Sequence, residues 1–149
     1  MPQKGLPTVT AIIVAAGASR RMGFDKLSYC LSDGRTVLEP SCALFGAHPA
    51  VDELVLVAGG NRPQCEAIAA ACPKPCTVVQ GGATRADSVH NGLAAAKGQL
   101  VAIHDAARPF ASEEVITRVL QAAAKTGAAA PAVPVKDTIK VADKDGKVV

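Results

Sequence analysis

The sequence has few aromatic residues and no long apolar run. It contains no tryptophan, one tyrosine and three phenylalanines, which leaves almost nothing on which nucleic-acid bases could stack. The longest apolar run, Ala11–Ala18, is interrupted by Gly17 and is far shorter than the roughly 18 residues that a membrane span needs. We therefore expect neither nucleic acid nor a membrane as a partner.

The cysteines form no recognisable framework. They are five in number, which is odd, and they include no C-x-x-C pair, so the sequence indicates neither a disulfide scaffold nor a zinc site. A reducing compartment fits this usage best, and we expect a cytoplasmic protein. At 149 residues the chain is long enough for one domain with a core that needs no disulfide bonds.

Apolar runs alternate with helical patterns along the chain. The near-continuous apolar run at residues 9–14 is typical of a strand buried in a parallel sheet. Further strands are expected at residues 53–58, 76–79, 100–104 and 128–135, and helices at residues 36–46, 63–71, 85–97 and 112–126. This alternation predicts a Rossmann-like α/β fold, an open and mostly parallel sheet with helices on both faces.

Capping patterns set the ends of several expected helices. Thr36 with Glu39, and Thr84 with Asp87, have the spacing of capping boxes. Gly127 stands where a glycine would end the last helix.

The last residues are predicted to form a hairpin. Residues 138–141 look extended, residues 143–146 form a turn, and residues 147–149 begin a return strand. The prolines at positions 131 and 134 weaken the strand expected just before this hairpin.

The junctions that follow the expected strands share a basic character. Each carries a cation and three carry glycine; they are residues 15–21, 59–62, 81–85, 105–108 and 136–138. Because the carboxyl ends of parallel strands meet at one edge of a sheet, positive potential is expected there, where a polyphosphate could bind. The net charge of +3 fits a small anionic ligand.

The first junction matches none of the better-known glycine loops. It lacks both the G-x-G-x-x-G pattern and the G-K-[ST] ending of a Walker loop, which argues against a dinucleotide dehydrogenase and a P-loop NTPase. The short side chains around Gly17 let backbone N–H groups approach phosphates, and Arg20, Arg21 and Lys26 follow to bind charge. Solvated surface cations are the alternative interpretation.

Asp105 is the acid that directly ends a central strand. A carboxylate beside a basic crevice suggests Mg²⁺ bridging it to phosphates, and an ion pair with Arg108 that closes the loop is the alternative. The other acids and histidines receive structural interpretations: Asp87 in the first turn of its helix, His104 as a satisfied core histidine, and His48 and His90 at the surface.

Four motifs, taken in order, resemble those of the 2-C-methyl-D-erythritol 4-phosphate cytidylyltransferase family. They are residues 15–22 with Lys26, residues 81–93, residues 104–109 and residues 135–140. The first motif fits any nucleotidyltransferase of the superfamily, whereas the other three together are specific. The resemblance runs from Thr10 to the last residue.

The resemblance implies a transfer from CTP to 2-C-methyl-D-erythritol 4-phosphate, giving 4-diphosphocytidyl-2-C-methyl-D-erythritol and pyrophosphate in non-mevalonate isoprenoid biosynthesis. It implies that Arg21 and Lys26 are catalytic and stabilise the α-phosphate in its transition state, with Mg²⁺ on Asp105 as cofactor. The implied binding residues are Ala15, Ala16, Gly17, Ala18, Gly82, Arg85 and Ser88 for CTP, with Ser88 on the cytosine, and Arg108 and Thr138 for the polyol phosphate.

The chain departs from the family pattern in three places. Many members have proline before the lysine, whereas this chain has Asp25 before Lys26, a variant that resembles the related molybdenum-cofactor guanylyltransferases. Ala83 replaces a residue that is often acidic or polar in the base pocket. Family members also continue beyond this length and complete an arm that embraces a partner subunit.

The resemblance therefore implies one nucleotidyltransferase domain, residues 1–149, that lacks its C-terminal part, with residues 138–149 as the start of a β-arm and a homodimer as the complete assembly. We expect the chain alone to be weakly active or inactive. Two alternatives stay open: a ribitol-5-phosphate cytidylyltransferase and a nucleotide-binding fragment without catalysis.

Overall fold

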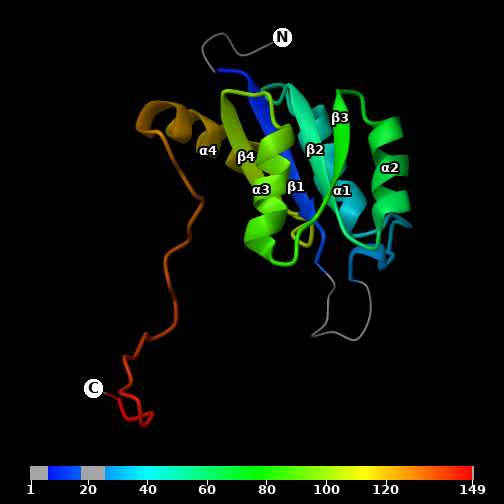
Figure 1. Cartoon of the computed structure of the whole chain (residues 1–149). Helices are drawn as coiled ribbons and strands as arrows, with labels where there is room; N and C mark the ends of the chain where they lie inside the picture. The colour runs from blue at the N-terminus through cyan, green and yellow to red at the C-terminus, as the bar shows by residue number, and fades with distance from the viewer. Residues whose placement is uncertain (1–6, 18–25, 149) are drawn as a thin grey trace.

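Four parallel strands form the central sheet of the computed structural model, which describes residues 7–17 and 26–148. They are β1 (Val9–Ala15), β2 (Glu53–Ala58), β3 (Cys76–Gln80) and β4 (Leu100–Asp105). Their order in space is β3-β2-β1-β4 (Figure 1). The chain thus builds outward from β1 and then returns to its other side, which places the topological switch point between β1 and β4.

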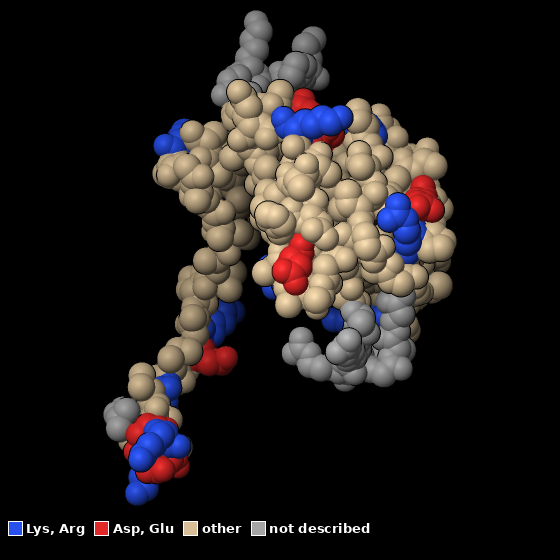
Figure 2. Space-filling view, viewed as in Figure 1, with Lys and Arg blue, Asp and Glu red and all other residues tan. Residues whose placement is uncertain are grey.

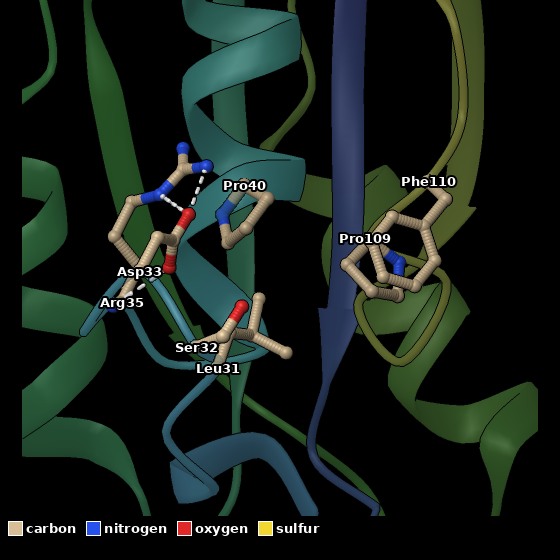
Figure 3. A pocket seen from close by; sticks show the side chains of 7 residues that line it. All are labelled: Leu31, Ser32, Asp33, Arg35, Pro40, Pro109 and Phe110. Carbon is tan, nitrogen blue, oxygen red and sulfur yellow. Dashed lines mark hydrogen bonds and ion pairs between the residues drawn. The ribbon is translucent and has the colours of Figure 1, made fainter.

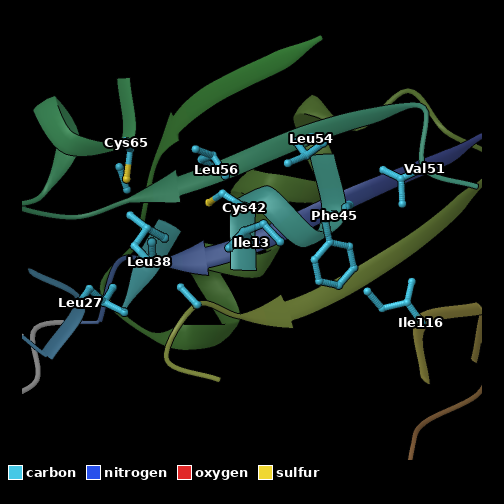
Figure 4. Close-up of a cluster of buried hydrophobic side chains, with 14 of the residues drawn as sticks. Ile13, Leu27, Leu38, Cys42, Phe45, Val51, Leu54, Leu56, Cys65 and Ile116 are labelled. Atoms are coloured by element: carbon cyan, nitrogen blue, oxygen red, sulfur yellow. The ribbon is translucent and has the colours of Figure 1, made fainter. Parts of the chain in front are cut away.

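Helices cover both faces of this sheet, as predicted. They are α1 (Leu38–Ala47), α2 (Arg62–Ala71), α3 (Arg85–Ala95) and α4 (Glu113–Thr126), with a short 3-10 helix, η1 (Lys26–Ser28), before α1. Because side chains alternate along a strand, β1 sends Ala11 and Ile13 into a larger core with α1, α2 and α4 (Figure 4). It sends Ile12 into a smaller core against α3.

Gly92 lets α3 lie close to the sheet. A Cβ atom at this position would stand 2.7 Å from Cγ2 of Ile12 and 3.0 Å from Cγ2 of Val57. Any larger residue would push α3 outward, and the loop that precedes α3 would move with it.

Two of the predicted helix ends are confirmed and one is wrong. Thr84 and Asp87 form a complete capping box on α3, and Gly127 ends α4 with a left-handed φ of 89°. Thr36 does not cap α1, which starts at Leu38. The Glu39 carboxylate accepts the Thr36 backbone N–H at 2.6 Å and the Thr36 hydroxyl at 2.8 Å, so only the Glu39 half of the expected box forms.

The strand predicted at residues 128–135 does not form. These residues are exposed and form no ladder with any strand that the structure describes. Pro131 and Pro134 cannot donate ladder hydrogen bonds. The segment leaves the body after α4 (Figure 1).

The predicted turn near the end of the chain is confirmed. The Gly146 N–H donates to the Asp143 carbonyl at 3.0 Å, and one antiparallel bridge joins Ala142 and Val148. Lysine and acidic side chains gather at this tip (Figure 2). That residues 138–149 begin a β-arm stays a prediction.

His48 was predicted at the surface, and this was wrong. It is only 1% exposed, because α4 packs over the end of α1. Its Nε2 lies 3.0 Å from Oγ1 of Thr117, and its Nδ1 accepts the Ala50 N–H at 3.2 Å. His90 is exposed, as predicted.

All five cysteines lie in the described part of the chain, and all are free thiols. Burial raises the pKa of Cys65 to about 11 and that of Cys76 to about 12, so both behave as core side chains. Among residues 7–17 and 26–148, no helix is long and apolar enough to cross a membrane.

Candidate functional site

The loops that follow β1, β2 and β3 are packed directly against one another. A Cβ atom on Gly59 would stand 2.8 Å from the Ala16 carbonyl oxygen, and one on Gly81 would stand 2.3 Å from the Ala16 Cβ. Glycine is therefore needed at both positions because the neighbouring loop occupies the space of a side chain. The structure confirms that these three junctions meet at one edge of the sheet.

The loop after β2 offers a buried donor at this edge. Oδ1 of Asn61 accepts the Gly59 N–H at 3.0 Å, which fixes the orientation of the amide. Its Nδ2 is buried and has no hydrogen-bond partner in the part of the chain that the structure describes. A buried donor without a partner is costly, so this loop is suited to an added acceptor.

The loop after β3 is held in shape by Ser88, which is 3% exposed. The Ser88 hydroxyl donates to the Thr84 carbonyl at 2.9 Å and accepts the Gly82 N–H at 3.1 Å. The structure therefore shows Ser88 shaping the loop that carries Gly82, and its contact with cytosine stays a prediction.

Asp105, at the end of β4, pairs with two arginines. Its Oδ1 accepts from Nε of Arg85 at 3.2 Å and from Nη2 at 2.8 Å, and its Oδ2 lies 3.3 Å from Nε of Arg108. The predicted pair with Arg108 is thus confirmed. The pair with Arg85 joins α3 to β4 across the switch point, and no sequence motif indicates it.

Asp105 fits one particular kind of magnesium site. Among the described residues, no group of three or more His, Cys, Asp or Glu side chains is placed to hold a metal. Magnesium, however, is often bound by one or two carboxylates together with substrate phosphates, and the Asp105 side chain is 33% exposed. The two guanidinium groups on Asp105 disfavour a bare cation, so the site suits a metal that arrives with a triphosphate.

His104, beside Asp105, is half-buried and does not lie in the core, but its ring is hydrogen-bonded, as predicted. Its ring centroid is 4.9 Å from that of Phe45, and its Nε2 is 3.1 Å from the Arg108 carbonyl oxygen. Burial lowers the pKa of His104, an effect that the Arg108 carbonyl and Asp105 partly oppose. The imidazole is therefore neutral near pH 7.

For four other predicted site residues, membership of this cluster stays a prediction. Ala18 and Arg21 lie outside the described residues. Lys26 opens η1, beside the buried Leu27. Thr138 is exposed on the segment that extends from the body (Figure 1), so its contact with a polyol phosphate stays a prediction.

A pocket of about 180 Å³ that no sequence motif indicates lies next to the turn after β4. Phe110 and Pro109 border one side and the Asp33–Arg35 pair the other (Figure 3). Hydrogen bonds from Arg35 hold the pKa of Asp33 below its usual value. The nearest sequence signal is the Pro109-Phe110 pair directly after Arg108.

Comparison with known proteins gives a consistent result. Residues 9–149 match the family model described as 2-C-methyl-D-erythritol 4-phosphate cytidylyltransferase. The chain is 44% identical over 144 residues to the protein of that name from Symbiobacterium thermophilum, covering 95% of this chain and 61% of the relative. It is 45% identical over 141 residues to the bifunctional enzyme IspD/IspF of Anaeromyxobacter dehalogenans, covering 94% of this chain and 36% of the relative.

Solved structures agree with the sequence comparison. The 4-diphosphocytidyl-2C-methyl-D-erythritol synthase of Anaerococcus prevotii superposes with a TM-score of 0.77 at 31% identity, covering 95% of this chain and 62% of that one. The Thermus thermophilus cytidylyltransferase gives 0.70 at 34% identity, with 95% and 63% coverage. This chain spans about three fifths of the length of the single-function relatives. The chain belongs to the 2-C-methyl-D-erythritol 4-phosphate cytidylyltransferase family.

Proposed function

We propose that the protein containing this chain joins CTP to 2-C-methyl-D-erythritol 4-phosphate, releasing pyrophosphate, as a step of isoprenoid biosynthesis. The observation that carries the proposal is the cluster at the switch point. There, Asp105 lies between Arg85 and Arg108, on the same sheet edge as the loops packed around Ala16. Family membership supplies the reaction, and this cluster supplies groups suited to phosphates.

The chemistry needs no general base. A phosphate oxygen of the polyol substrate, already ionised near neutral pH, attacks the α-phosphorus of CTP; the new P–O bond forms as the bond to pyrophosphate breaks. Catalysis is then positioning and charge stabilisation. Magnesium, when bound, adds positive charge along the triphosphate.

This chain's residues divide that task. The backbone of residues 15–17 and 81–82 approaches the nucleotide, and Arg21 and Lys26 stabilise the charge that develops on the α-phosphate. Arg108 binds the polyol phosphate and Arg85 the triphosphate. Asp105 would hold the metal together with the phosphates, and the metal would supply positive charge there. The residues of the last motif, with Thr138, approach the same substrate in the complete protein.

Assembly and location are part of the same proposal. The complete protein is a cytoplasmic homodimer, in which residues 138–149 begin the arm that reaches a second copy. The support is the exposed, extended course of this segment, which carries Ile139 and Val141 at 74% and 67% exposure. Side chains of this kind are stabilised by burial against a partner.

A nucleotide-binding fragment without turnover is the second candidate, because the chain spans about three fifths of the length of its relatives.

We suggest incubating the 149-residue chain with CTP, Mg²⁺ and either methylerythritol phosphate or ribitol 5-phosphate. Pyrophosphate release is measured together with CTP binding by calorimetry. Slow release with methylerythritol phosphate is expected. Release with ribitol phosphate alone would instead support the ribitol enzyme, and binding without release would support the fragment.

Matched arginine variants test where the substrate lies. Arg108→Gln removes a cation at the cluster, and Arg118→Gln removes one from an exposed pair with Glu114 on α4. We expect Arg108→Gln to reduce turnover by about 10²-fold or more and Arg118→Gln to leave it unchanged. Equal effects from both variants would contradict the proposed site.

A further inference from the structure

The turn at residues 105–108 carries the proposed site residues Asp105 and Arg108, and the His104 side chain is hydrogen-bonded to its backbone. Nε2 of His104 lies 3.1 Å from the Arg108 carbonyl oxygen and 3.3 Å from Oγ of Ser41. A carbonyl oxygen can only accept, so Nε2 must carry the proton. The His104 N–H is therefore shared between the Arg108 carbonyl and the Ser41 hydroxyl.

Ser41 extends this network to a second carbonyl of the same turn. Its hydroxyl donates to the Ala106 carbonyl oxygen at 3.3 Å, which leaves its oxygen free to accept from His104. Ser41 is 1% exposed on α1. Two carbonyls of the turn thus point at one neutral imidazole and one serine.

Two backbone hydrogen bonds and one ring contact also hold the turn. Ala106 is fully buried, and its N–H donates to the Val14 carbonyl at 3.1 Å. The Arg108 N–H donates to the Asp105 carbonyl at 3.0 Å. The ring of Phe45, from α1, packs against His104 and limits how the imidazole can rotate.

We propose that His104, with Ser41, is a positioning residue that fixes the turn carrying Asp105 and Arg108 without touching a substrate itself. Packing alone needs only an apolar side chain at this place. The His104 N–H, shared with Ser41, instead fixes the orientation of the Ala106 and Arg108 carbonyl groups. The backbone positions from which the Asp105 and Arg108 side chains extend are fixed with them. The functional part of this inference rests on the proposed function, whereas the positioning of the turn does not.

Three variants separate positioning from packing. His104→Leu fills the space without a donor, and His104→Gln offers an amide N–H near the place of Nε2. Ser41→Ala removes the bond to Ala106 and the acceptor that Ser41 offers to His104, and it leaves the bond from His104 to Arg108 in place. We suggest measuring amide hydrogen exchange of Ala106 and Arg108, with the β2 amides as the internal control, and CTP·Mg²⁺ binding by calorimetry.

In His104→Leu, the Ala106 and Arg108 amides should exchange about tenfold faster and CTP·Mg²⁺ should bind about tenfold more weakly, while β2 protection is retained. His104→Gln should restore both measurements to within about threefold of wild type, and Ser41→Ala should show the same pattern more weakly. Should His104→Leu fail to fold, the comparison of Ser41→Ala with wild type decides.

The proposal is overturned if the turn exchanges at wild-type rates in His104→Leu, or if His104→Gln loses as much as His104→Leu at equal β2 protection. An intact exchange pattern in a wild-type chain that does not bind CTP would count against the proposed function and leave the positioning role supported.

Discussion

The strand-end loops and the C-terminal segment follow different structural rules. In the loops, Gly59 and Gly81 lie so close to Ala16 that neither position has room for a side chain. Beyond Gly127, residues 128–148 are exposed throughout and bond mainly to one another at the 143–147 turn. The strand-end loops are held in place by contacts with one another, whereas the C-terminal segment exposes apolar side chains that the rest of the chain does not bury.

Core truncation is expected to give the largest contrast between the two regions. Leu56 is fully buried in β2, and Ile139 is 74% exposed. Leu56→Ala should lower the free energy of unfolding by about 2–5 kcal/mol, and Ile139→Ala should change it by less than about 0.5 kcal/mol. Urea unfolding of both variants measures the difference, and similar losses would show that the segment packs on the body in solution.

Glycine substitutions test the loops themselves. Gly81→Ala places a methyl group 2.3 Å from the Ala16 Cβ, whereas Gly60 has open space around it. We expect Gly81→Ala to cost about 1–3 kcal/mol of stability and to weaken CTP binding, because the first and third loops must separate. Gly60→Ala, the control, should do neither; tight CTP binding by Gly81→Ala would show that the loop contact is dispensable.

Removal of a helix cap should have an intermediate effect. The Ser112 hydroxyl accepts the Val115 N–H at 3.3 Å at the start of α4, and Thr138 is an exposed hydroxyl residue in the segment. Ser112→Ala should destabilise the chain by about 1 kcal/mol, and Thr138→Ala should not affect stability. Thermal unfolding compares them, and no change in Ser112→Ala would mean that the hydroxyl does not cap α4.

The smallest expected effect is a pH dependence at the other end of the sheet. Burial raises the pKa of Glu53, but bonds from the Thr10 hydroxyl and the Lys97 N–H outweigh it, so the net pKa is below the usual 4.5. A depressed pKa gives stability that is present above pH 4.5 and is lost as the pH falls through the folded value. In urea unfolding, the difference in free energy of unfolding between wild type and Glu53→Gln should therefore shrink below pH 4.5. A difference that grows there would show that folding raises the pKa of Glu53.

Most features that depend only on neighbouring residues were predicted correctly, with the capping box at Thr36 as an exception. The apolar run of β1, the Thr84–Asp87 capping box and the turn at 143–146 were all recognisable, because each needs only a few adjacent residues. The pairing of Asp105 with Arg108 belongs to the same class, since three residues separate them.

What the sequence could not predict depends on contacts between distant elements. Arg85 reaches Asp105 only because β4 returns to the far side of β1, and His48 is buried only because α4 covers the end of α1. Residues 128–135 have the apolar composition of a strand. Pro131 and Pro134 weakened that prediction without deciding it, because a strand also needs a partner that only the rest of the fold can supply.

Hydrogen exchange with and without CTP·Mg²⁺ tests the central claim most directly, because it reads both regions in one experiment. We predict that the nucleotide slows exchange in residues 81–88 and 105–108 and leaves residues 128–148 unchanged. Unchanged exchange in both loops at a CTP concentration that saturates binding would contradict a nucleotide site at this edge of the sheet.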